Sequence, residues 1–352
     1  WSQDTASTVM AVGASTAGKR VRQTFRRFNY QPGKSQLIIV TGTFGVSQTG
    51  VKKLMGLFDA DNGIFLQDNG GTIQAVIRSS VTGSPVDSAV NQANWNIDPF
   101  DGTGPSGYTL DPEKSQIFIV DMEWLGVGRV RVGFVIDGIP YYAHQFVHAN
   151  VEAGVYMSTP NLPLRYEIEN TGTGAATDFE HICSTVVSEG GSQDIGVNRC
   201  NSLGNAVVNA NAAGTIYALC GLRFKTTNLD GIVKLVNVSL LEDGIIDYEW
   251  LLIFNPTIAG TPSWADETNS VVQFGKGDTT GNPSTTTVTG GTIMIAGYVK
   301  GGNNSGSTLE NLDTAQQLGS LIDGTSDEVW LCVRPLAANA DIHASLAWRE
   351  LS

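Results

Sequence analysis

Two carboxylates two residues apart, Asp121 and Glu123, come nearest in type and spacing to catalytic chemistry. In a strand they share one face, and such a pair can supply the acid and the nucleophile of glycoside hydrolysis. Residues 129–136 have the pattern of a return strand, which places Arg131 opposite Asp121. The same register places Arg129 opposite Glu123. Because an ion-paired carboxylate has a lowered pKa and is a poor general acid, we predict that the chain is not an enzyme.

Metal and nucleophile chemistry have weaker support. Asp59, Asp61 and Asn62 cluster oxygen ligands, but they lack the alternating acids and distal Glu of a calcium loop. Turn-forming side chains explain this cluster equally well. The four cysteines have no Cys-x-x-Cys spacing, and the four scattered histidines suggest no Ser-His-Asp arrangement. We therefore predict no metal site and no cofactor.

Sugar binding is the other chemistry that the side chains suggest. A loop at residues 96–115 is dense in Gly, Pro and Asp, and long loops of this kind are usually functional or disordered. Trp95 and Tyr108 lie beside or on this loop, where an exposed aromatic ring next to polar groups can stack on a sugar. With Asp101 as a polar neighbour, Trp95 and Tyr108 are the candidate glycan contacts. The same residues packed beneath the loop would instead indicate a scaffold.

The elements that position these residues are strands. Apolar residues alternate along 116–124 and again along 130–136, with a glycine-containing turn between them. Pairing Met122 with Val130 keeps both apolar faces together and also forms the two acid–arginine pairs. Many Gly, Thr, Ser, Val and Asn residues favour short strands and turns over helices throughout the chain. We predict an all-β protein, an antiparallel β-sandwich of concanavalin-like or jelly-roll style, with two β-rich lobes.

Composition shifts along the chain predict its domains. Residues 1–24 are small and polar, and we expect an extended N-terminal arm. Residues 25–187 contain closely spaced strand patterns and form the predicted β-sandwich domain. Residues 188–214 are poor in large apolar side chains and have the composition of a linker. Residues 215–352 form a second β-rich domain.

The net charge of the chain limits the kinds of binding partner that we expect. The net charge of −13 argues against a general nucleic-acid-binding protein, and no apolar run is long enough to predict a membrane-spanning helix. A basic cluster nevertheless lies near the N-terminus, with no acidic residue inside it: Lys19, Arg20, Arg22, Arg26 and Arg27. These cations either pair with carboxylates of the same chain or contact a neighbouring subunit. We treat them as the candidate subunit-contact arm.

Several phrases in the first half carry a family resemblance: residues 30–36 (YQPGKSQ), 56–65 (GLFDADNGIF), 101–107 (DGTGPSG), 123–134 (EWLGVGRVRVGF) and 156–168 (YMSTPNLPLRYEI). Together they resemble a family of largely uncharacterised structural proteins from large double-stranded DNA viruses, chiefly tailed phages of aquatic environments. The resemblance spans roughly residues 20–190. The second half resembles these proteins only loosely.

The resemblance implies a non-enzymatic virion protein, assembled in the host cytoplasm and located in the virus particle. A capsid, capsid-decoration or tail-fibre component is the expected role. Its expected partners are further copies of itself and other virion proteins. The alternative is a carbohydrate-binding module that recognises a glycan receptor as part of a virion appendage. An exposed Trp95 or Tyr108 in a groove would favour this alternative.

Overall fold

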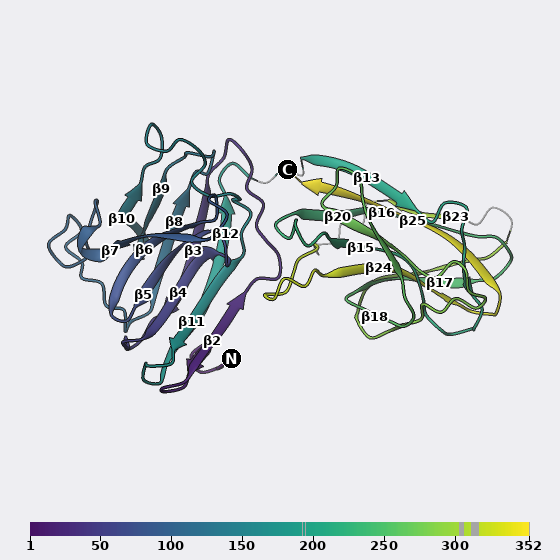
Figure 1. Cartoon of the computed structure of the whole chain (residues 1–352), viewed down its shortest axis with the longest axis horizontal. Coiled ribbons are helices and arrows are strands. Elements are labelled where there is room, and N and C mark those ends of the chain that lie inside the picture. The colour runs from purple at the N-terminus through teal and green to yellow at the C-terminus, as the bar shows by residue number, and fades with distance from the viewer. Residues whose placement is uncertain (192, 194, 303–305, 311–316, 352) are drawn as a thin grey trace. The chain divides into compact units, whose positions relative to one another are not determined.

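The structure is a computed structural model that describes all residues except 192, 194, 303–305, 311–316 and 352. The chain divides into two compact units, residues 1–193 and 194–352, called here the first and the second unit (Figure 1). In the described residues every regular element is a strand, apart from one 3-10 turn at Gln92–Asn94. The prediction of an all-β protein with two β-rich lobes is therefore confirmed.

The first unit contains two antiparallel sheets of six strands each. One sheet has the order β1 (Thr8–Val12), β12 (Thr177–Ser188), β3 (Gln36–Thr43), β8 (Gln116–Met122), β9 (Val130–Ile136) and β10 (Ile139–Phe146). The other has the order β2 (Ala17–Gln23), β11 (Leu164–Thr171), β4 (Val51–Phe58), β5 (Gly63–Asn69), β6 (Thr72–Ser79) and β7 (Val86–Asn91). Strands β7 and β10 are thus edge strands of opposite sheets.

The inner faces of these two sheets form one apolar core. The alternation along β3 shows why: Ile38 and Val40 point inward and are fully buried, while their neighbours are half-buried. Phe118 and Phe134 meet across the β8–β9 pair, with ring centres 5.9 Å apart. Burial of each such side chain stabilises the fold by about 1.5–3 kcal/mol. This core makes the first unit a β-sandwich.

The β8–β9 hairpin has the predicted register. Met122 is opposite Val130, and Asp121 is opposite Arg131. The turn between the strands needs glycine at position 128, because a Cβ atom there would lie 2.0 Å from the backbone oxygen of Glu123. The pattern of apolar and charged residues was therefore sufficient to fix this pairing.

The N-terminal segment is not the extended arm that its composition predicts. Within residues 1–24, β1 pairs with β12 and β2 pairs with β11, so the segment supplies one edge strand to each sheet of the first unit. Met10 and Val12 point into the core and are only 7% exposed. An edge strand needs few apolar residues because only part of its surface is covered, and charged side chains are common there. Small polar composition therefore did not identify it as a strand.

The second unit is also built from antiparallel strands. One sheet has the order β13 (Gly196–Ser202), β25 (Ala340–Leu351), β16 (Ile232–Glu242) and β23 (Gly306–Glu310), and β14 (Val208–Ala210) also pairs with β25. The other large sheet has the order β19 (Ser263–Asp266), β20 (Val272–Lys276), β15 (Tyr217–Phe224), β24 (Glu328–Pro335), β17 (Tyr248–Phe254) and β22 (Thr292–Val299). A separate two-stranded sheet pairs β18 (Thr257–Ile258) with β21 (Val288–Thr289). A separate core that includes Leu331 and Trp348 lies within this unit.

The predicted linker at 188–214 is wrong for most of its length. Strands β13 and β14 both lie within it and pair with β25, the last strand of the chain. The boundary between the units falls at 193/194 instead. The predicted domains 25–187 and 215–352 are correspondingly too short. Strand β13 is largely exposed and is held mainly by backbone pairing with distant residues, which local hydrophobicity does not reveal.

Candidate functional site

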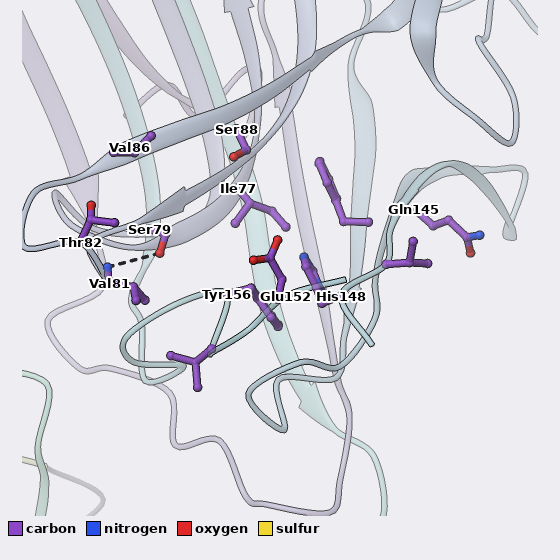
Figure 2. A pocket seen from close by; sticks show the side chains of 13 residues that line it. Ile77, Ser79, Val81, Thr82, Val86, Ser88, Gln145, His148, Glu152 and Tyr156 are labelled. Carbon is purple, nitrogen blue, oxygen red and sulfur yellow. Dashed lines mark hydrogen bonds between the residues drawn. The ribbon is translucent and has the colours of Figure 1, made fainter. Parts of the chain in front are cut away.

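A groove of about 540 Å³ opens at one edge of the first unit, where β6 and β7 of one sheet face the end of β10 and the segment 147–156 (Figure 2). We call it the edge groove. Its lining residues are Ile77, Ser79, Val81, Thr82, Val86, Ser88, Gln145, Phe146, Val147, His148, Glu152, Val155 and Tyr156. Its volume lies within the range of small-ligand sites, about 300–1,000 Å³.

Strands β6 and β7 form one wall. Ser88 pairs with Ile77 and Val86 pairs with Ser79, so these four side chains share one face of the two-stranded wall. Their positions follow from the period of two along each strand. Ser88 is exposed, and among the described residues its hydroxyl has no hydrogen-bond partner. The wall therefore presents a free hydroxyl between apolar side chains.

The segment after β10 forms the opposite wall and carries a fixed imidazole. The His148 ring is stacked on the Tyr156 ring, with centres 4.1 Å apart and planes within 10°. His148 Nδ1 donates a hydrogen bond to the backbone oxygen of Gly128 at 2.7 Å, because a carbonyl can only accept. Gly128 belongs to the β8–β9 turn, so the hairpin holds this wall in place. In the neutral ring, Nε2 remains an acceptor.

Glu152 is the charged side chain of the groove. A turn brings it there: the backbone N–H of Glu152 donates to the backbone oxygen of His148 at 2.9 Å. Figure 2 shows the Glu152 carboxylate pointing toward Ile77 and Ser88 on the opposite wall. Among the described residues, none bonds to this exposed carboxylate. It is thus free to accept hydrogen bonds from a ligand.

Exposed aliphatic side chains form the rim. Val81, Val86, Val147 and Val155 are 39–55% exposed, and all four line the groove. Single exposed valines need no explanation, but a group around one cavity marks a surface suited to apolar contact. The groove thus combines an aliphatic rim with hydroxyl, amide, imidazole and carboxylate groups. It can bind an amphipathic ligand but shows no arrangement for covalent chemistry.

Trp95, a predicted glycan contact, is buried instead. Only 5% of it is exposed, its ring packs near Phe134, and its Nε1–H donates to the backbone oxygen of Val90 at 3.1 Å. An indole with its face in the core and its N–H bonded internally cannot stack on a sugar. The prediction for Trp95 is therefore wrong, and its packing in the core is the outcome that indicates a scaffold role for this residue.

Tyr108 and Asp101 remain accessible but lie outside the edge groove. Tyr108 is 37% exposed and meets Tyr141 edge-on at 5.3 Å. Asp101 accepts hydrogen bonds from both the backbone and the hydroxyl of Thr103, which lower its pKa. A β-bridge between Asp101 and Thr109 closes part of this loop. A glycan contact at these two residues stays a prediction.

The basic cluster lies on the first unit and pairs partly with its own carboxylates. Lys19 forms an ion pair with Glu167, and Arg27 pairs with Asp59 at 2.7 Å. Arg26 lies over the ring of Phe28 at 5.4 Å. Arg20 donates to the backbone oxygen of Lys19, and Arg22 lies opposite Tyr166 in the sheet. The cluster belongs to β2 and the residues after it, not to a free arm.

The carboxylates considered for catalysis have partners. Asp121 forms an ion pair with Arg131, and Glu123 pairs with Arg129 at 3.4 Å. Asp59, from the acid-rich turn, accepts hydrogen bonds from the backbone N–H groups of Asp61 and Asn62. This is the turn-forming role. Among the described residues, no group of three or more His, Cys, Asp or Glu side chains could hold a metal ion.

Sequence reasoning missed the edge groove. Its walls come from residues 77–88 and 145–156, which are separated in the chain and carry no motif. Ser88 and Glu152 are ordinary polar residues until the sandwich brings them together. Near the end of β10 the sequence has two histidines four residues apart, His144 and His148, and only His148 lines the groove among the described residues. His144 points elsewhere: it accepts a hydrogen bond from the backbone of Asn96, and burial lowers its pKa.

Comparison with known proteins adds little. No protein-family model and no curated protein sequence matches the chain. A legume lectin-like domain from Entamoeba histolytica aligns with 9% identity and a TM-score of 0.30, covering 52% of this chain and 83% of the other. Domains LG4-5 of the mouse laminin alpha1 chain align with 6% identity and a TM-score of 0.26, covering 94% and 80%. The binding domain of botulinum neurotoxin DC in complex with SialylT aligns with 8% identity and a TM-score of 0.27, covering 93% and 89%.

These alignments are too weak to support an argument about function. The assignment of the fold rests on the strand pairing and the two cores. No helix in the described part of the chain has the length and apolar character needed to cross a bilayer.

Proposed function

We propose that this protein is a non-enzymatic carbohydrate-binding protein and that its first unit binds a glycan in the edge groove. The observation that carries the proposal is the set of unpaired polar side chains in the groove, Ser88 and Glu152, beside the oriented ring of His148. Sugars present many hydroxyl groups, and a site that offers fixed donors and acceptors satisfies them at low entropic cost.

The shape and the surroundings of the groove also suit a saccharide. Sugars have apolar C–H faces as well as hydroxyls, and the valine rim supplies apolar contact. The walls belong to the sandwich or to a turn that is hydrogen-bonded to it, so the groove is largely formed before a ligand binds. The ion pairs at Asp121 and Glu123 support a binding role over hydrolysis.

The second candidate function is a structural role in a virus particle. The phrases within residues 20–190 support it, because they resemble virion proteins in several segments that occur in the same order. The two roles are compatible, since a virion appendage can both assemble and recognise a glycan receptor. Location in the virion and association with other virion proteins remain parts of this second proposal.

The test of glycan binding uses two matched variants on β7. Ser88→Trp fills the edge groove, whereas Ala89→Trp places the same bulk on the opposite face of the same exposed strand. We expect the full chain to bind glycans on an array, and we expect calorimetry to show a loss of about tenfold or more for Ser88→Trp, roughly 1.4 kcal/mol. Ala89→Trp should bind as wild type.

Equal affinity of the two variants would place the glycan elsewhere, and Tyr108→Ala would then test the loop around Asp101. Absence of binding to every glycan on the array would refute the proposed function. Thermal unfolding of both variants is the control for folding, and it should give matching midpoints because both positions are exposed.

A further inference from the structure

We infer that the edge groove selects a saccharide with an acetamido group, that is, an N-acetylhexosamine residue. This inference rests on the proposed glycan binding and names the class of sugar. An acetamido group differs from a sugar hydroxyl in three ways: it has an N–H donor, a carbonyl acceptor and a methyl group. The groove offers a complement to each of them.

The polar groups of the groove are rich in acceptors. The free carboxylate of Glu152 only accepts hydrogen bonds, and His148 Nε2 accepts in the neutral ring because Nδ1–H is committed to Gly128. An amide N–H is a suitable donor to the carboxylate, and a hydrogen bond to a charged group is stronger than one between neutral groups. The hydroxyl of Ser88, on the opposite wall, can donate to the acetamido carbonyl.

The valines provide the complement to the methyl group. Val86 stands on β7 and Val155 on the opposite wall, and both line the groove while remaining 55% and 39% exposed. A ligand methyl placed against either valine removes apolar surface of both partners from water. A hydroxyl in the same place would gain nothing from these side chains. The rim thus favours the acetamido group over the hydroxyl.

The charge of the groove-lining residues narrows the class of saccharide further. Among the described residues that line the groove, Glu152 is the one carboxylic acid and none is Lys or Arg. A saccharide carboxylate or sulfate would meet a like charge without a compensating cation. The groove therefore favours neutral N-acetylhexosamines over acidic sugars.

The experiment compares two tetrasaccharides that share backbone and linkage. Chitotetraose carries an acetamido group at C2 of each residue, and cellotetraose carries a hydroxyl there. We expect calorimetry on the full chain to show about tenfold tighter binding of chitotetraose, from one buried methyl and one charged hydrogen bond. The double variant Val86→Thr/Val155→Thr should reduce the preference to about threefold, because chitotetraose loses more apolar contact at these positions than cellotetraose does.

Glu152→Gln tests the polar contact separately. It keeps an oxygen acceptor but removes the charge, and we expect chitotetraose to bind about three- to tenfold more weakly. All three positions are exposed, so unfolding midpoints should stay near wild type. Equal affinity for both tetrasaccharides, or a preference that survives both variants, would overturn the inference.

The outcomes also separate this inference from the proposed function. If neither tetrasaccharide binds but another glycan on the array does, and Ser88→Trp abolishes that binding, the glycan site stands and the N-acetylhexosamine selectivity is wrong. If no glycan binds at all, both are wrong.

Discussion

At the residue scale, His181 on β12 has an unusual environment. Within the described part of the chain neither of its buried ring nitrogens has a hydrogen-bond partner, and the ring packs against Tyr166 with centres 4.1 Å apart. Burial, together with the nearby charge of Arg22, lowers the pKa of His181 to about 4. Its ordinary value in an unfolded chain is about 6.5. The folded chain thus resists protonation of this residue.

This difference predicts a pH dependence of stability. Between pH 6.5 and 4 the unfolded chain binds a proton that the folded chain does not, so the free energy of unfolding falls as the pH is lowered through that window. The loss from His181 should be on the order of 2 kcal/mol, reduced from the full shift because the residue is partly exposed. His181→Phe removes the titrating ring and two buried, unpaired nitrogens, and should be at least as stable at pH 7.

Urea unfolding of wild type and His181→Phe at pH 7, 5.5 and 4 measures the effect. The gap between the two proteins should widen as the pH falls, which separates His181 from His144, whose pKa burial also lowers. If the unfolding free energies of the two proteins changed with pH in parallel, His181 would not be the cause of the pH dependence.

At the element scale, the sequence was informative where side-chain pattern alone decides pairing. In the β8–β9 hairpin, two apolar faces and the Asp121–Arg131 pair agree on one register, and the structure has it. Strands β1, β2 and β13 were missed because they are edge strands that pair with distant partners. Their residues satisfy backbone hydrogen bonds without needing a continuous apolar face. Local composition does not reveal a strand that pairs from more than a hundred residues away in the sequence.

The corrected N-terminal segment carries its own prediction. Deleting residues 1–24 removes Met10 and Val12 from the core, at about 1.5–3 kcal/mol for each side chain. It also removes the Gly13 carbonyl that accepts from Asn170 at 2.8 Å. We expect the truncated chain to lose on the order of 3–5 kcal/mol of unfolding free energy in chemical denaturation. Unchanged stability would instead support the detachable arm that composition suggested.

At the scale of the whole molecule, the sequence predicted two β-rich halves but not the site. The edge groove exists only because the β7 edge of one sheet and the end of β10 in the other face each other across the sandwich. Neither a sequence motif nor a composition bias indicates that these two sheet edges lie close together. Trp95, the aromatic residue that the sequence suggested as a glycan contact, packs in the core of the sandwich instead. The location of the groove therefore follows from the strand topology and not from the chemistry of single side chains.

The proposed virion role requires that copies of the chain assemble. A shell or fibre is built from repeated copies, so we expect light scattering of the full chain to give a multiple of 37.4 kDa. Deleting residues 1–24 is not a clean test, since loss of β1 and β2 would destabilise the first unit as well as remove any contact between copies. Ser88→Trp is the better comparison, because it blocks the groove and leaves both cores intact. It should keep the wild-type mass while losing glycan affinity. A monomer at every concentration would contradict the assembly role and leave glycan binding standing by itself, whereas a mass that falls with Ser88→Trp would show that the groove is itself the contact between copies.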